Sequence, residues 1–160
     1  MQLYRRTREY SVEWDAAREA LIVRVDMLDE HHDMGVAVVF SYPELAIHEI
    51  HPRMDRTPYP VCPQALGKVQ SCVGLQVRAG VSLMITRQIG GNAGCTHVTN
   101  LLIDACHSVV QGLLAMHAQQ QKGSDRRSVL PAPEKIAFLE QHNLSPRNTC
   151  VAYTLPEDLL

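Results

Sequence analysis

The first fifty residues carry short, valine-rich apolar runs separated by polar turns, a pattern that predicts β-strands. Residues 21–27 (LIVRVDM) form one run, and the polar turn 29–33 follows them. Residues 34–40 form a second run, and the proline-containing turn 41–44 has hairpin length and leads to a run at 45–51. A further strand is expected within residues 4–14. Together these runs predict an antiparallel meander of three or four strands.

Helical spacing takes over later in the chain. Residues 53–63 contain several prolines and are expected to form an irregular loop. Residues 64–77 predict a helix, and 81–89 a shorter element whose type the pattern leaves open. The clearest helix spans 96 to about 121, and 134–142 predict a short last one. In the long helix, apolar side chains recur at three- and four-residue intervals: Val98, Leu101, Leu102, Ala105, Val109, Leu113 and Met116.

These elements predict an α+β fold in which an antiparallel sheet of three or four strands packs against two or three helices. A chain of 160 residues suits a single domain and can bury a sizeable core. We expect residues 1–122 to form the core of this domain. Residues 123–160 are expected to add a polar linker, the short helix and a C-terminal arm that packs back on the core.

Composition excludes several classes of function. Apolar residues make up 46% of the chain and charged residues 20%, which is typical of a globular protein rather than a disordered one. A net charge of −2 argues against a nucleic-acid binder, which needs a strongly basic face. Arg5, Arg6 and Arg8 are interpreted as a solvated strand face, because Glu9 and Glu13 follow closely.

The same sequence gives an expected location. No run approaches the roughly 20 apolar residues that cross a bilayer, and the first ten residues are polar with three arginines. We therefore expect a cytoplasmic protein without membrane contact. In that compartment the cysteines are expected to be thiols rather than disulfides. There are five of them, at positions 62, 72, 95, 106 and 150.

The segment 90–97 (GGNAGCTH) carries the most suggestive chemistry. Its glycines, Gly91 and Gly94 among them, allow unusual backbone conformations and close approach to a bound group. The helix start that follows offers free N–H groups and a partial positive charge, which favours a thiolate at Cys95. Cys95 and His97 face opposite ways on a regular helix, so they converge only if Cys95 belongs to the turn. A purely structural glycine turn with a small buried cysteine remains an alternative.

Cys, His and Asp side chains are the usual ligands of zinc or of iron in a mixed site. Two further segments could reach the glycine turn: the polar turn with His32 and Asp33, and the end of the proline-rich loop with Cys62. We therefore predict a metal site formed by Cys62, Cys95 and His97, joined by His32 or Asp33. No CxxC pair occurs in the chain.

The remaining cysteines and histidines receive plainer interpretations. Cys72 and Cys106 fall within predicted helices and are expected to act as small apolar residues. His48 and His51 are three apart on a predicted strand and are interpreted as structural or surface residues. Whether Cys150 joins the site stays open. A phosphate-binding loop is disfavoured, because the Walker pattern needs a lysine where Cys95 stands.

Several motifs carry a resemblance to a known family over roughly residues 4–115. They are His32-Asp33-Met34, the segment 58–63 (PYPVCP), Gly74-Leu75, and GGNAGCTH with Leu101-Leu102. In these motifs the chain resembles a bacterial family catalogued as domain of unknown function 2889, and Thr149-Cys150 is similar to that family's late Thr-Cys pair. The family name implies no activity.

A second resemblance concerns motif order alone. An Asp-Met step opens a hairpin, Cys62 follows, and a Cys–His step begins a long helix. In this order the chain is similar to NifU/IscU-type iron–sulfur scaffolds, which hold zinc or a nascent cluster with an Asp, cysteines and a neighbouring His. His32 stands where a cysteine is expected, and the Cys–His order is reversed. The resemblance implies binding of a metal ion or an iron–sulfur cluster.

Three classes of function therefore stay open. The leading hypothesis is a zinc, iron or iron–sulfur binding domain, either accessory or catalytic. A metal-free enzyme would use Cys95 as nucleophile and His97 or His32 as base. A non-catalytic interaction subunit, with a protein partner or as a homo-oligomer, would keep the glycine turn as structure and dock through its apolar helix face. The sequence does not decide among the metals or possible substrates.

Overall fold

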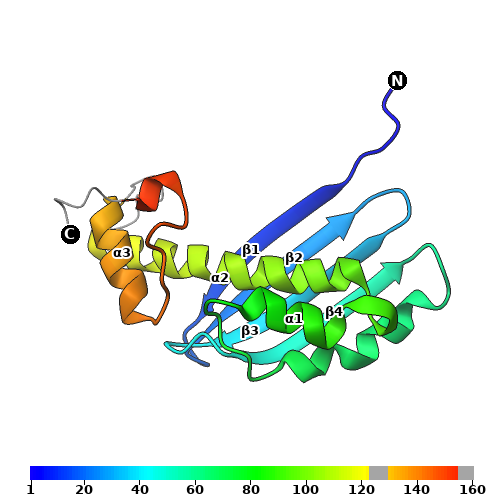
Figure 1. The fold of residues 1–160 in the computed structure, drawn as a ribbon, viewed down its shortest axis with the longest axis horizontal. Helices are drawn as coiled ribbons and strands as arrows, with labels where there is room; N and C mark the ends of the chain where they lie inside the picture. Colours follow the sequence, from blue (N-terminus) through cyan, green and yellow to red (C-terminus); the bar gives the residue numbers. More distant parts are fainter. Residues whose placement is uncertain (123–129, 155–160) are drawn as a thin grey trace.

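The computed structural model describes residues 1–122 and 130–154, which form an α+β domain (Figure 1). Its strands pair as an antiparallel meander in the order β1-β2-β3-β4. They are β1 (Thr7–Asp15), β2 (Ala20–Leu28), β3 (Asp33–Ser41) and β4 (Ile47–Arg56). The helical elements are η1 (Cys62–Cys72), α1 (Val81–Ile89), η2 (Gly91–Ala93), α2 (Thr96–Lys122), α3 (Ala132–Gln141) and η3 (Val151–Tyr153), where η marks a 3-10 helix. The predicted fold class is confirmed.

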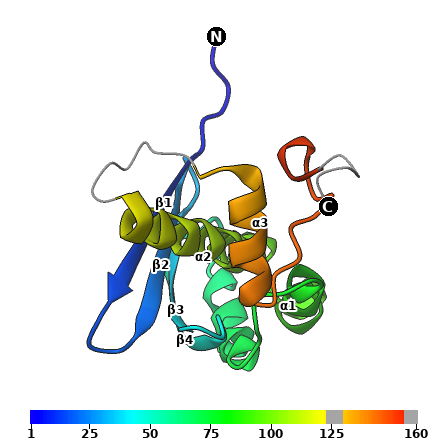
Figure 2. The same ribbon diagram turned by 90° about the vertical axis from the view of Figure 1, so that its left-hand side faces the viewer.

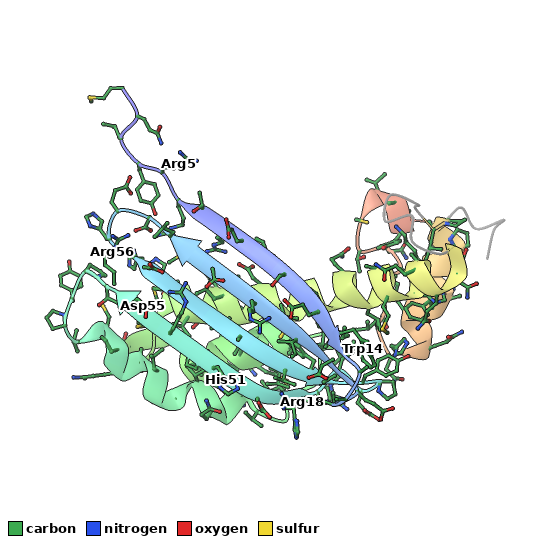
Figure 3. All side chains as sticks on the ribbon, turned by 180° about the vertical axis from the view of Figure 1, so that it is seen from behind. Arg5, Trp14, Arg18, His51, Asp55 and Arg56 are labelled. Carbon is green, nitrogen blue, oxygen red and sulfur yellow. The ribbon has the colours of Figure 1, made fainter. Side chains whose placement is uncertain are left out.

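One face of the sheet is apolar, because alternate residues of a strand share a face. Val23 and Val25 of β2 and Val38 and Phe40 of β3 are fully buried there. Figure 2 shows the helices gathered on this side, and α2 contacts β1, β2 and β3. Figure 3 looks onto the opposite face, in front of which the described residues place no helix.

Helix α2 supplies the other half of the core. Leu101, Leu102 and Leu113 have no exposed surface, which confirms the apolar spacing predicted for this helix. By length and composition alone, Thr96–Gln121 would also be long and apolar enough to cross a membrane. Here its apolar stripe lies against the sheet. Gly112 allows the close approach, since a Cβ at this position would lie 2.2 Å from Cγ1 of Val12.

Three predicted elements differ in extent or type. Residues 53–56, expected in a loop, continue β4, because Pro52 is tolerated on an edge strand. Residues 62–72 form a 3-10 helix rather than part of an α-helix that reaches 77. The segment after it pairs with the start of β4 instead: Ile47 N–H donates to Leu75 O, and Gly74 N–H donates to Ile47 O. Val81–Ile89, whose type was open, is an α-helix.

The C-terminal part of the described chain packs on the core. Leu139 of α3 and Leu144 belong to the same apolar cluster as α2 and the sheet. The last predicted helix is present as Ala132–Gln141. Most of the predicted polar linker and the end of the predicted arm fall on residues 123–129 and 155–160, which lie outside the described residues.

Candidate functional site

Three connections meet at one end of the sheet: the β2–β3 turn, the β4–η1 connection and the junction between η2 and α2 (Figure 1). The residues before β1 leave from the same end. His32 lies in the first connection, Cys62 at the end of the second, and Cys95 with His97 at the third. The chain topology therefore gathers the predicted site segments at one end of the molecule.

Asp29, in the β2–β3 turn, is the buried centre of a polar cluster at this end, and its side chain has no exposed surface. Oδ1 accepts hydrogen bonds from the backbone N–H groups of His31 and His32, at 2.8 Å each, and from Nδ1 of His32 at 3.0 Å. Oδ2 accepts from the Tyr4 hydroxyl and from Nε of Arg6, both at 2.8 Å.

Burial raises the pKa of the Asp29 carboxyl, but the hydrogen bonds from His31, Tyr4, Arg6 and His32 outweigh it. They hold the pKa of Asp29 well below its ordinary value, so the group is an anion at neutral pH. An ionised carboxylate can only accept hydrogen bonds. Nδ1 of His32 therefore carries a proton in this contact, which leaves Nε2 as the ring nitrogen that can offer a lone pair.

The imidazole rings of His32 and His97 lie side by side, although they come from distant parts of the chain. Their centroids are 4.2 Å apart and their planes are inclined by 52°. Nη2 of Arg6 lies 3.3 Å from Nε2 of His97, and because guanidinium can only donate, that nitrogen accepts. Burial, and next the nearby His32 and Arg6, lower the pKa of His97, which keeps its ring neutral at pH 7.

The glycine turn sets the start of α2 by close packing. Gly91 has φ of +71°, a left-handed conformation that favours glycine. Gly94 is extended, yet a Cβ there would lie only 1.8 Å from the carbonyl oxygen of Ile89. The Gly94 N–H donates to Gly91 O, so the turn uses this N–H internally. The two glycines predicted to contact a cofactor thus have clear steric and hydrogen-bonding reasons to be there.

Cys95 occupies the position just before the first residue of α2. Its carbonyl oxygen accepts the Thr99 N–H at 2.9 Å, the first helical hydrogen bond, and also the Thr99 hydroxyl at 2.9 Å. Cys95 therefore belongs to the turn, as its convergence with His97 requires. Its side chain is half-buried against the core and is a free thiol.

Asp33 lies next to His32 in sequence but is engaged elsewhere. Its carboxylate accepts from Nη1 of Arg53 at 2.7 Å, beside Asp26, on the sheet face that α2 leaves uncovered. Cys62 begins η1 and is a half-buried free thiol. Within residues 1–122 and 130–154, no three His, Cys, Asp or Glu side chains are arranged to hold a metal ion. Of the predicted site residues, the structure joins His32 to His97.

Two other cysteines and two other histidines lie as predicted. Cys72 and Cys106 are fully buried in the core. Burial raises the pKa of Cys72, and burial together with the nearby Cys72 raises the pKa of Cys106 to about 12. Both are therefore unreactive thiols at neutral pH. His48 and His51 are exposed on the edge strand β4.

Sequence reasoning missed the residues that hold the histidine pair in place. The interpretation of the N-terminal arginines as a solvated face is wrong for two of them. Arg6 bonds Asp29 and His97, and Arg8 pairs with Asp104 of α2. Asp29 could have been noticed as a turn residue whose side chain bonds the backbone two and three positions on. No sequence motif near Asp29 indicated its contacts with the N-terminal segment.

Comparison with known families agrees with the resemblance in sequence. The profile of the family described as protein of unknown function (DUF2889) matches residues 12–111. The chain belongs to this family. The matched region includes Asp29, His32, Cys62, Cys95 and His97, whereas Tyr4 and Arg6 precede it. Neither a curated protein nor a solved structure matches the chain. The likeness to NifU/IscU-type scaffolds gains no support from these comparisons.

Replacement of Asp29 by Asn tests whether the carboxylate at the centre of the polar cluster stabilises the fold. We expect Asp29→Asn to lower the free energy of unfolding at pH 7 by about 2 kcal/mol, because the buried donors lose their anionic acceptor. Since the folded-state pKa is depressed, ionised Asp29 stabilises the protein above an unfolded pKa of about 4, and this stabilisation is lost as the pH falls below that value.

Urea unfolding between pH 7 and pH 2 measures this linkage. The wild type should lose more stability on acidification than Asp29→Asn does. Asp55→Asn is the matched control, because Asp55 is an exposed carboxylate that pairs with Arg53 on the open sheet face. Parallel stability curves for the wild type and Asp29→Asn would show that Asp29 has no special role.

Proposed function

We propose that the chain binds a transition-metal ion, zinc or iron, or an iron–sulfur cluster at the pair formed by His32 and His97. The observation that supports this most is the buried Asp29 carboxylate bound to Nδ1 of His32, with the His32 ring against a neutral His97. Metal-binding histidines almost always donate their second ring N–H to a carboxylate, a carbonyl or water, which fixes the ring and raises its basicity. Nε2 of His32 then has the free lone pair that a metal ligand needs.

Two imidazoles supply half of the four ligands that zinc takes in most protein sites. In this proposal Cys95 and Cys62 provide the others. Cys95 sits in the turn before α2, two residues from His97. Cys62 begins η1 at the same end of the sheet (Figure 1). A sphere of protein ligands alone would make the metal structural or in transit, whereas an open position would permit catalysis.

In the metal-free protein, Arg6 occupies the ring nitrogen of His97 that a metal ion would need. Its guanidinium donates to Nε2 of His97 and brings a positive charge to the pair. Arg6 is also held by Asp29, through Nε at 2.8 Å and Nη2 at 2.7 Å. A metal ion that takes Nε2 of His97 therefore breaks one hydrogen bond of 3.3 Å and leaves the ion pair with Asp29 intact. Metal coordination at His97 therefore displaces Arg6 with the loss of a single hydrogen bond.

This competition leads to a testable expectation for Arg6→Gln. Loss of the cation should raise the affinity for Zn²⁺ about tenfold, which corresponds to about 1.4 kcal/mol, the size of one hydrogen bond to a charged group. Competition titration with a chelator measures the affinity, and urea unfolding checks that the variant is folded. Arg8→Gln is the control, since Arg8 pairs with Asp104 and makes no hydrogen bond to His97. Equal gains in both variants would mean that only net charge matters.

A second candidate function rests on the same carboxylate–imidazole contact. A general base in nucleophilic catalysis is oriented by a third group, which is the role that Asp29 could play for His32. Cys95 would be the nucleophile, with His32 or His97 as the base. Alkylation by iodoacetamide distinguishes the two candidates. In chelator-treated, folded protein, fast labelling of Cys95 that slows in His32→Ala favours the enzyme, whereas protection of Cys95 by added Zn²⁺ favours the metal site.

A further inference from the structure

Strand β1 is an open edge of the sheet. It pairs with β2 over its full length, in one register and without a bulge, and it contains no proline. In the part of the chain that the structure describes, the backbone groups of Thr7–Asp15 bond to no element other than β2. Figure 3 shows β1 along the border of the sheet, with Trp14 near one end. An uncovered edge strand of this kind is a template for another strand.

The opposite edge, β4, is covered instead. The Gln70 side chain of η1 donates to Ile50 O at 2.7 Å, and the segment after η1 bonds both backbone groups of Ile47. Pro52 removes a further donor, and register shifts interrupt the pairing of β4 with β3. Among the described residues, the fold therefore closes one edge of the sheet and leaves the other open.

We propose that two copies of this chain pair antiparallel through β1, about a two-fold axis at Tyr10, and join their sheets into one. Under such an axis the α2 side of both sheets faces the same way. Directly opposite residues therefore point to the same side of the joined sheet, so an even-numbered residue stands opposite an even-numbered one and an odd-numbered residue opposite an odd-numbered one. With Tyr10 against Tyr10 of the second copy, Arg5 stands opposite Asp15. In the same register Thr7 stands opposite Glu13, and Glu9 opposite Ser11.

Charge complementarity selects this register. Basic residues precede β1 or stand at its start, and Glu13 and Asp15 lie in its second half, so an antiparallel pair brings opposite charges together. Centring the axis on Glu9 sets two copies of Glu9 against each other. Centring it on Ser11 or on Val12 sets Glu9 against Glu13 or against Asp15. Like charges directly opposite each other destabilise a strand pair, and the Tyr10 register has none.

Apolar surface supports the same pairing. Tyr10 is 51% exposed and lies on the side of β1 that faces α2, as its hydroxyl contact with Asp104 shows. Trp14, on the same side, is 42% exposed. In the proposed dimer the two Tyr10 rings meet at the axis, where they are partly removed from water, and aromatic cross-strand pairs stabilise antiparallel sheets.

Light scattering during gel filtration of the full chain tests the dimer. The wild type should have twice the mass of one chain. Tyr10→Arg sets two cations across the axis and should give a monomer that keeps the circular dichroism spectrum of the wild type. His51→Arg adds the same charge on the covered edge β4 and should remain a dimer. A monomeric wild type, or a Tyr10→Arg variant that stays dimeric, overturns the proposal.

Cross-linking tests the register. In a Cys150→Ser background, which removes the exposed thiol, single cysteines are placed at positions 10, 11 and 12 and oxidised with diamide. Directly opposite residues in an antiparallel pair have Cβ atoms about 4.5–5.5 Å apart, within reach of a disulfide after small adjustments. Tyr10→Cys should cross-link to a covalent dimer, and Ser11→Cys and Val12→Cys should not. Preferential cross-linking of either of the latter overturns the Tyr10 axis.

Discussion

Alanine in place of His32 or His97 should lower the affinity for Zn²⁺ at least about 100-fold, more than loss of an outer hydrogen-bond partner costs a metal site. The ring centroids lie 4.2 Å apart, the Asp29 carboxylate orients His32, and burial lowers the pKa of His97. Chelator competition measures the affinity. Titration with Co²⁺ reports the ligand set, because a thiolate ligand adds a charge-transfer band. His107→Ala is the control, since His107 is exposed on α2.

The cysteine variants show which thiols complete the site. Cys95→Ser and Cys62→Ser should weaken binding sharply and remove the thiolate–cobalt band, because a serine hydroxyl is a poor ligand at neutral pH. Cys72→Ala and Cys106→Ala should keep the affinity and lose only stability, of the order of 1 kcal/mol. Unchanged affinity in both histidine variants would remove the proposed site, whatever the cysteine variants do.

The elements that could be predicted from the sequence are those whose pattern is local. The stripe of apolar residues in α2 and the valine-rich runs of β2 and β3 each repeat over several turns or pleats, so their periods are clear. The end of β4 could not be predicted, because Pro52 indicates a break unless the strand is known to lie at an edge. Edge position is a property of the whole sheet.

The same division holds for the candidate site. The glycine turn and Cys95 before the helix are local features, and both are present. His32 and Asp33 could not be ranked from the sequence, because it did not say which of the two would face His97. Arg6 reaches Asp29 only because the register of β1 sets Thr7 opposite Leu28. That register depends on the packing of the whole sheet, which no motif reports.

Among the substitutions predicted to affect stability, Gly94→Ala should lower the free energy of unfolding the most, because it adds a methyl group at a crowded position. Its Cβ would lie 1.8 Å from the carbonyl oxygen of Ile89 and 2.6 Å from the carbonyl carbon, and backbone atoms cannot rotate away as a side chain can. Either the end of α1 or the start of α2 must move, and the carbonyl of Cys95 accepts the first hydrogen bond of α2. We expect Gly94→Ala to lower the free energy of unfolding by about 3 kcal/mol.

Gly67→Ala is the matched control for this prediction. Gly67 lies in η1, and a Cβ there would meet no atom within 4 Å. The free energy of unfolding of Gly67→Ala should be unchanged, or raised by up to about 1 kcal/mol, because alanine lowers the entropy of the unfolded chain. Urea unfolding at pH 7 compares the two variants, and Zn²⁺ titration of folded Gly94→Ala reports whether Cys95 and His97 have moved. If Gly94→Ala is as stable as Gly67→Ala, the close contact between Gly94 and Ile89 does not exist in solution.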